Sequence, residues 1–297
     1  MIDRLLRQWR RFLLCTILFG LFMTLAAISG MWQISPYPRG LSAGISIALT
    51  LLIVVVVPLV LATYFAPSCL PAMEIVLMAL IAVAILRPIL ELLIGADGVG
   101  PWSYGLTLLI AYFGIYKLIY GDWLTDFWRR DVPTRTTNFT IDRPIEEVWA
   151  GLFPSPETAA RYYWPQTQFV APPAGTGADF LMISPRKDGY NDSSALLNIE
   201  AAKSRTHFRI LSRPLISSSR QGDYSMREEV TLTEHANEGT EVTLTRSFMN
   251  VPFGTRLFWF LMEDIKDAAS CMKARLEDKR DWSLLGAQLL KPSRNSA

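Results

Sequence analysis

The chain has 297 residues, of which 51% are hydrophobic, and this composition is too apolar for an ordinary soluble protein. Its net charge of +2 is small and its basic residues form no stripe, which argues against nucleic-acid binding. The three cysteines and two histidines lack ligand spacing, and there is no phosphate-binding glycine loop, so the sequence predicts no disulfide framework, metal site or cofactor.

Apolar residues are concentrated in the first part of the chain, and charged residues reach ordinary globular density from Lys117 onward. A helix needs about 20 residues to cross the hydrocarbon of a bilayer. Four segments, separated by prolines or by the turn at 95–101, reach this length, so the sequence predicts a transmembrane region over residues 1–120. The expected spans are 12–32, 41–65, 72–94 and 102–120.

Basic residues flank the expected spans mainly on one side, and the loops of the other side hold only Arg39 and Asp97. Basic flanks are retained in the cytoplasm. We therefore expect a multi-pass protein of the cell (inner) membrane with its N-terminus and its C-terminal domain in the cytoplasm. The flanking bases are Arg4, Arg7, Arg10 and Arg11 before the first span, and Lys117, Arg129, Arg130 and Arg135 after the fourth.

The first thirty residues also resemble a secretory signal, with a basic start, an apolar run and small residues near 27–30. Cleavage there would leave three spans in the same orientation. The apolar run is long for a signal core, which favours an uncleaved span.

Arg87 and Glu91 lie one helical turn apart inside the third expected span. Either both reach the outer interface, or they form a buried pair that fixes helix packing beside Pro88. A transporter is disfavoured because the spans offer few further ionisable positions from which to build an ion path.

Residues 121–133 join the two halves and carry Trp123, Phe127 and Trp128 before Arg129 and Arg130. Aromatic rings with arginines are typical of the headgroup zone, so this segment is expected to be an interfacial linker. A simple helix end is the alternative.

From residue 134 the pattern changes to short elements separated by turn residues. Asp142 and Pro144, followed by two glutamates, are typical of a helix start. The order is a strand at 134–141, this helix, a second short helix at 156–163, six strands, and one long helix at 254–280. The strands are expected at 167–171, 178–183, 195–202, 206–212, 226–233 and 241–248, and the apolar stripe of the long helix is Leu257, Leu261, Ile265, Ala268, Met272 and Leu276.

This order of elements, together with the opening sequence from Phe139 to Trp149, resembles the START-like helix-grip superfamily of polyketide cyclases, lipid-transfer domains and pollen-allergen-like proteins (the SRPBCC group). The resemblance covers residues 134–281 and implies an α+β domain in which a curved antiparallel sheet grips the C-terminal helix around an apolar cavity. The expected fold class is thus four transmembrane helices followed by a helix-grip domain, with a tail at 282–297. That tail either lies on the membrane, docks on the domain or remains loose.

The last two strands predict a candidate ligand site. If they pair across the turn at 235–239, Glu228 faces Arg246, and Val230 faces Leu244, on the same side as the other apolar positions. The pair then looks into the cavity and orients a ligand's polar head. A pair at the sheet margin, or a register shifted by one residue, is the alternative. The other candidate ligand-binding residues are Leu261, Ile265 and Met272 of the helical stripe, and Tyr163.

Tyr163 lies between Tyr162 and Trp164, where members of the superfamily open their cavity. These rings either line an entrance or pack the second short helix on the sheet. His207 is expected to point outward beside Arg205 and Arg209, which favours a surface residue over a general base.

The sequence leaves three functions open. The first is binding of a hydrophobic small molecule or lipid taken from the bilayer, without turnover. The second is a scaffold that binds another membrane protein and whose interior is filled by side chains. The third is a cyclase-like or aromatase-like enzyme, which is disfavoured because no acid/base set comes together. In the scaffold alternative, the large side chains expected to fill the cavity are Phe180, Phe208, Phe248, Phe258 and Trp259.

Overall fold

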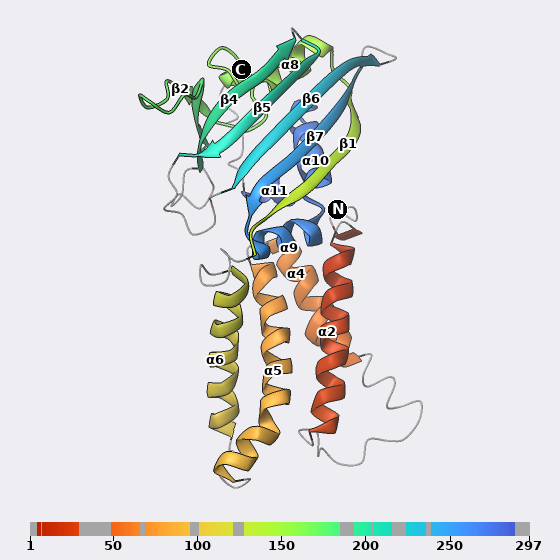
Figure 1. Cartoon of the computed structure of the whole chain (residues 1–297). Helices are drawn as coiled ribbons and strands as arrows, with labels where there is room; N and C mark the ends of the chain where they lie inside the picture. The colour runs from red at the N-terminus through yellow and green to blue at the C-terminus, as the bar shows by residue number, and fades with distance from the viewer. Residues whose placement is uncertain are drawn as a thin grey trace. The chain divides into compact units, whose positions relative to one another are not determined.

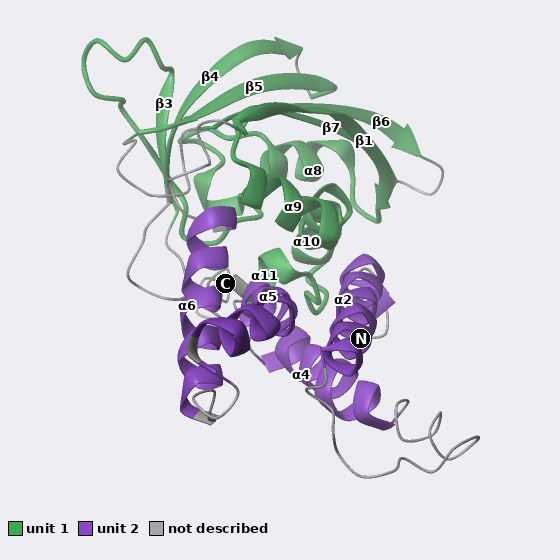
Figure 2. Cartoon of the chain, turned by 60° about the horizontal axis from the view of Figure 1, so that its bottom comes forward, with its two compact units in different colours: residues 1, 126–297 green, residues 2–125 purple. Residues whose placement is uncertain are grey.

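The computed structural model divides the chain into two compact units, residues 2–125 and residues 126–297, coloured separately in Figure 2. The boundary falls near the change in composition. The residues that the structure describes are 5–6, 8–29, 49–65, 69–95, 101–120, 128–184, 193–203, 205–215, 224–235 and 239–288.

The first unit consists of apolar helices (Figure 1). Within the described ranges, three of them are long and apolar enough to cross a membrane, over Trp9–Ile28, Leu70–Leu93 and Trp102–Ile119. The second expected span, 41–65, is described only from residue 49, and Leu49–Phe65 is a shorter apolar helix. The elements are α2 (Trp9–Ile28), η1 (Leu52–Val56), α4 (Val57–Phe65), α5 (Leu70–Ile94) and α6 (Pro101–Tyr120).

The element η1 is a π-helical turn at the run of valines, in which the Val57 N–H donates to the Leu52 carbonyl. Pro58 follows directly and has no N–H to give to the carbonyl one α-helical turn before it. A π turn is one of the ways in which a helix absorbs such an interruption.

Two ion pairs lie among the described residues of the first unit. The guanidinium of Arg11 on α2 pairs with Glu74 on α5, both are buried, and Arg11 Nη1 also donates to Gln8 Oε1 over 3.0 Å. On α5, Arg87 Nε donates to Glu91 Oε1 over 2.6 Å, with the two side chains 17% and 31% exposed. The expected proximity of Arg87 and Glu91 is confirmed, whereas sequence reasoning assigned Arg11 only to the basic flank.

The second unit is built on a seven-stranded antiparallel sheet with the order β1-β7-β6-β5-β4-β3-β2 (Figure 1). Its strands follow the expected ones to within a few residues, and β1 begins inside the segment assigned to the linker. Residues 121–127 of that linker lie outside the described residues. The strands are β1 (Arg130–Ile141), β2 (Gln168–Val170), β3 (Phe180–Ser184), β4 (Ser193–Lys203), β5 (His207–Pro214), β6 (Ser225–His235) and β7 (Gly239–Val251).

Helices lie against one face of this sheet (Figure 2), and we call it the inner face. Along β6 and β7 every second residue is buried there, as in Val230, Leu232, Val242 and Leu244. The opposite face, here the outer face, carries the alternating polar residues. The helices are α8 (Ile145–Leu152), α9 (Phe253–Met262), α10 (Asp264–Leu276) and α11 (Leu284–Gln288).

The expected second short helix, 156–163, is wrong. The segment holds only a 3₁₀ turn, η4 (Ala159–Arg161). Ser155 and Thr158 exchange hydrogen bonds with each other's backbone N–H groups, and Thr158 Oγ1 also donates to the Phe153 carbonyl. Such local side-chain bonds compete with the hydrogen bonds of a helix.

The expected single long helix, 254–280, is also wrong. The chain forms α9 and α10 with a break at Glu263, which adopts a left-handed conformation at φ +50°. The break allows Asp264 to start α10 directly below the sheet, where it pairs with Arg135 of β1. Of the tail, α11 docks on the domain, since Leu284 is buried and Leu285 packs on the main core. Residues 289–297 lie outside the described part of the chain.

Candidate functional site

The expected register of the last two strands is confirmed. Glu228 is opposite Arg246, Val230 opposite Leu244, and Leu232 opposite Val242. Because side chains alternate along a strand, this register sends all three pairs to the inner face.

The Glu228–Arg246 pair is close and buried. The Oε2 atom of Glu228 lies 2.5 Å from Arg246 Nη2 and 2.6 Å from Nε, and the two residues are 9% and 8% exposed. Burial lowers the pKa of Arg246, but the charge of Glu228 and the hydrogen bond to it outweigh burial and raise that pKa above its ordinary value. The guanidinium therefore stays charged inside the domain.

A second pair adjoins the first. Arg135 on β1 is the register partner of Arg246, and its Nη1 lies 2.6 Å from Asp264 Oδ1 at the start of α10. Burial raises the pKa of Asp264 above its ordinary value, although Arg135 and Arg246 oppose the rise. The four residues Glu228, Arg246, Arg135 and Asp264 form what we call the inner charge cluster.

The second oxygen of Asp264, Oδ2, is buried without a hydrogen-bond partner among the described residues. Buried polar atoms are normally satisfied, so an open acceptor on the inner charge cluster is a place where a donor group of a ligand would be stabilised. Sequence reasoning found Glu228 and Arg246 but missed Arg135 and Asp264. The alternation of β1, which puts Arg135 on the same face as Phe139 and Ile141, was the available signal.

Tyr162 and Tyr163 lie next to this cluster. Their ring centroids are 4.8 Å apart, and Tyr163 is buried. Burial raises the pKa of both phenols, and the negative charge of Glu228 raises them further, so both hydroxyls keep their protons at neutral pH. The segment that failed to form a helix thus places two phenol groups beside a buried carboxylate.

The remaining candidate residues are all buried. Val230, Leu244, Ile265, Met272 and Tyr163 belong to one core cluster. Leu261 of α9 is buried but is not a member of that cluster. The structure therefore brings together the candidates of the sheet, α10 and Tyr163.

Aromatic side chains fill part of the same interior. The Phe208 ring centroid lies 5.4 Å from that of Trp149 and 5.5 Å from that of Phe153, both edge-on, and Phe208 is fully buried. Of the other expected filling residues, Phe248 lies in a separate cluster with Val132 and Val251, and its ring centroid lies 4.1 Å from that of Trp259.

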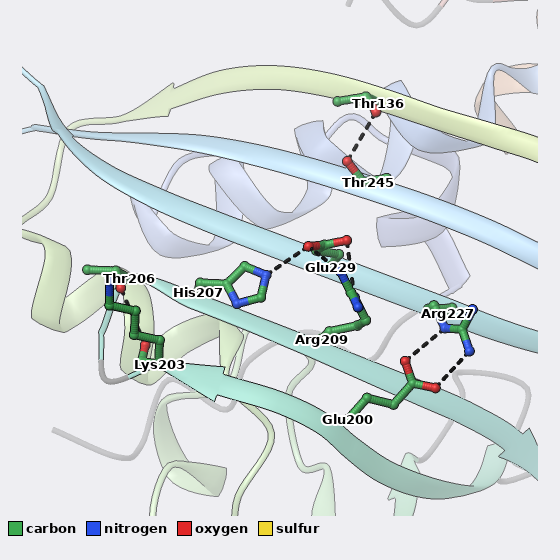
Figure 3. A network of polar contacts seen from close by, with 9 residues as sticks. All are labelled: Thr136, Glu200, Lys203, Thr206, His207, Arg209, Arg227, Glu229 and Thr245. Carbon is green, nitrogen blue, oxygen red and sulfur yellow. Dashed lines mark hydrogen bonds and ion pairs between the residues drawn. The ribbon is translucent and has the colours of Figure 1, made fainter.

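The outer face of the sheet carries a separate polar network (Figure 3). Glu229 accepts from His207 Nε2 over 2.8 Å and from Arg209 Nη2 over 2.9 Å, and Arg227 pairs with Glu200. A shallow depression on this face is lined by Arg209, Arg227 and Glu229. His207 is therefore on the outer face, as expected, and is not brought to Glu228 or Arg246.

No family model and no curated protein matches the chain. Solved structures resemble about half of it. A protein from Arthrobacter aurescens shares 14% identity with a TM-score of 0.38, over 51% of this chain and 90% of its own. The protein Ara h 8.0201 shares 15% identity with a TM-score of 0.34, over 49% and 95%. DynU16, described as a putative protein in the dynemicin biosynthetic locus, shares 19% identity with a TM-score of 0.35, over 50% and 49%.

Proposed function

We propose that this protein is anchored in a membrane by its N-terminal helices and binds a hydrophobic small molecule or lipid, which has a polar head, inside a cytoplasmic helix-grip domain. The observation that carries the proposal is the buried Glu228–Arg246 pair on a mostly apolar inner face, with Tyr163 beside it. A ligand site is typically an apolar surface with a few convergent polar groups.

The energetics of buried charge support this proposal. Removing two charges from water costs several kcal/mol per ion, and apolar residues of similar volume are often at least as stabilising as a buried pair. The inner charge cluster is therefore a poor way to stabilise the domain but a good way to orient a polar head. A ligand head that accepts hydrogen bonds would find donors in the guanidiniums of the inner charge cluster and in the two phenols. A head that also donates would find an acceptor in Asp264 Oδ2.

Anchoring gives such a domain access to membrane ligands, because tethering raises their effective concentration at the site. We propose a fourth span at 41–65, which gives an even number of crossings and places both ends of the chain in the cytoplasm. The apolar helix Leu49–Phe65 is the described part of that span.

The test is mass spectrometry of small molecules that co-purify with the full chain in mild detergent. We expect a reproducible ligand in the wild-type protein and its loss in the double variant Glu228→Gln/Arg246→Met, which removes both charges and leaves no unpaired ion. The matched control is Arg209→Gln/Glu229→Gln, which removes the Arg209–Glu229 ion pair, and with it the charge that faces His207, from the outer face. A folded wild-type protein without any ligand, or equal ligand in the two double variants, contradicts the proposal.

A scaffold function is the second candidate. The contacts of Phe208 with Trp149 and Phe153 favour it, because they fill one part of the interior. A chain that carries no small molecule but retains another membrane protein through purification would support this candidate.

A further inference from the structure

The outward side of α9 is apolar where a surface helix is normally polar. Phe253, Arg256, Leu257 and Phe260 follow the spacing i, i+3, i+4 and i+7, so they share one side of the helix. Met262, on the opposite side, is buried, and so is Leu261 at the margin between the two sides, whereas Phe260 is 48% exposed. The sequence of α9 contains one arginine and no acidic residue.

The start of the second unit extends this surface. The ring of Trp128 lies edge-on to that of Phe253 at a centroid distance of 5.3 Å, and Trp128 is 49% exposed. Arg256 Nη2 donates to the Trp128 carbonyl over 2.6 Å, and the Arg256 guanidinium lies 5.8 Å from the Phe253 ring centroid. Residues far apart in sequence thus form one aromatic surface.

Positive charge accompanies these rings. Burial lowers the pKa of Arg256, and the charge of Arg130 lowers it further, so the two guanidiniums are close enough to repel each other. The two nearby acids at the end of α9 and the start of α10 pair with other bases, Glu263 with Lys266 and Asp264 with Arg135. Arg129 adds a third positive charge and donates to the Asn250 carbonyl, while its neighbour Asp131 accepts from the Asn250 N–H.

The chain itself keeps this surface near the membrane. Eight residue steps separate the end of α6 at Tyr120 from Trp128, which is at most about 28 Å of extended chain. Aromatic rings and arginines together are what the headgroup zone of a bilayer accommodates, and anionic lipids attract basic residues within about a Debye length of the surface.

We propose that α9 and Trp128 form a membrane-docking surface, with Phe260 and Trp128 inserted among the acyl chains and Arg130 and Arg256 bound to anionic phospholipid headgroups. This inference rests on the membrane anchoring proposed above and is independent of what the inner charge cluster binds. Docking holds the domain against the leaflet from which its ligand comes.

The test uses the full chain in lipid nanodiscs with a nitroxide at Phe260→Cys, in a background in which the exposed Cys69 is replaced by serine. Thr233→Cys, at an exposed position of β6, is the control site. Collisions with oxygen report lipid, and collisions with a water-soluble nickel chelate report water. With phosphatidylglycerol present we expect position 260 to favour oxygen and position 233 to favour nickel.

The charges are tested in the same experiment. We expect Arg130→Gln/Arg256→Gln to abolish the oxygen preference at position 260, and the matched pair Lys203→Gln/Arg205→Gln to leave it unchanged. Three results would overturn the inference in a chain that has entered the nanodisc. The label at 260 favours nickel, it is shielded from both reagents by protein, or its oxygen preference is the same in phosphatidylcholine alone as with phosphatidylglycerol. A chain that does not enter nanodiscs contradicts the anchoring itself.

Discussion

The guanidinium of Arg11 and the carboxylate of Glu74 bring two charges into the interior of an apolar helical unit. Removing one partner leaves the other charge buried, which costs about 3–5 kcal/mol. We therefore expect Glu74→Leu to lower the stability of the full chain in mild detergent by that amount, measured as a fall in the free energy of unfolding in a denaturant titration.

The matched control for Glu74 is Glu91→Leu. Its partner Arg87 is partly exposed and also lies 5.7 Å from the Tyr104 ring centroid, so the cost should stay below about 1 kcal/mol. The double variant Arg11→Leu/Glu74→Leu should recover much of the loss. Equal costs at Glu74 and Glu91 would show that the Arg11 pair is not buried. The pair also joins α2 to α5 within the first unit.

At Gly286 the absence of a side chain has a specific cause. An added Cβ atom would lie 1.8 Å from Asp281 Oδ2, and Asp281 is held by Arg275 at 3.1 Å and by the Ser283 hydroxyl at 2.6 Å. We expect Gly286→Ala to displace α11 and to cost about 1–3 kcal/mol. Hydrogen exchange of the 281–288 backbone should rise.

Ala287→Ser, a small change on the same helix, should leave that exchange unchanged. Because the clash is with Asp281, the costs of Gly286→Ala and Asp281→Ala should not add in the double variant. If the stability costs of the two substitutions did add, a clash with Asp281 would not be the reason that Gly286→Ala destabilises the domain.

Among the elements, β5 and β6 are joined on the outer face by a carboxylate that two basic side chains share. Hydrogen bonds from Arg209 and then from His207 lower the pKa of Glu229 below its ordinary value of 4.5. The ionised form is thus favoured in the folded state, and its stabilisation is fully present above pH 4.5 and is lost as the pH falls through the lowered pKa.

We therefore expect the melting temperature of the wild-type chain to exceed that of Glu229→Gln above pH 4.5, with the difference shrinking as the solution is acidified. Glu234→Gln, at an exposed position of the same strand, should show a smaller difference at every pH. If the difference in melting temperature between wild type and Glu229→Gln widened in acid, the pKa of Glu229 would be raised by folding and not lowered.

Some features of the elements could be predicted from the sequence pattern and others could not. The pairing of β6 with β7 was predictable because alternation fixes which residues face the core, and a slip of one residue would have exposed Val230 and Leu244. The break at Glu263 was not, because no glycine or proline marks it and it accompanies a contact of Asp264 with Arg135 on a distant strand. The docking of the short helix α11 also depends on a residue distant in sequence. The carboxylate oxygens of Asp267 accept hydrogen bonds from the N–H groups of Leu284 and Leu285.

For the candidate site, the sequence predicted the pair that two adjacent strands define and missed the pair that involves β1 and α10. Neighbouring strands joined by a short turn have a register that the turn fixes. The pairing of β1 with β7 joins residues about a hundred or more positions apart, and its register shifts near Arg135, so alternation alone does not place that side chain beside Arg246.

At the scale of the whole molecule, composition predicted the division into an apolar unit and a charged one, because crossing a bilayer requires long uncharged helices. Orientation is a separate matter. It depends on bases beside the helices, and Lys117 in the last turn of α6 together with the arginines at 129 and 130 predicts that the second unit faces the cytoplasm.

Reporter fusions in living cells test this topology. A reporter that is active only in the cytoplasm should be active when joined after Cys69 or Arg130 and inactive after Arg39 or Gly98. If residues 41–65 did not cross the bilayer, the spans at 72–94 and 102–120 would still be crossings, and the number of spans would be three. The reporter after Cys69 would then match the one after Arg39, whichever side that is, and the second unit would lie on the opposite side from the N-terminus. Activity after Cys69 combined with inactivity after Arg39 is therefore the result that requires the span at 41–65.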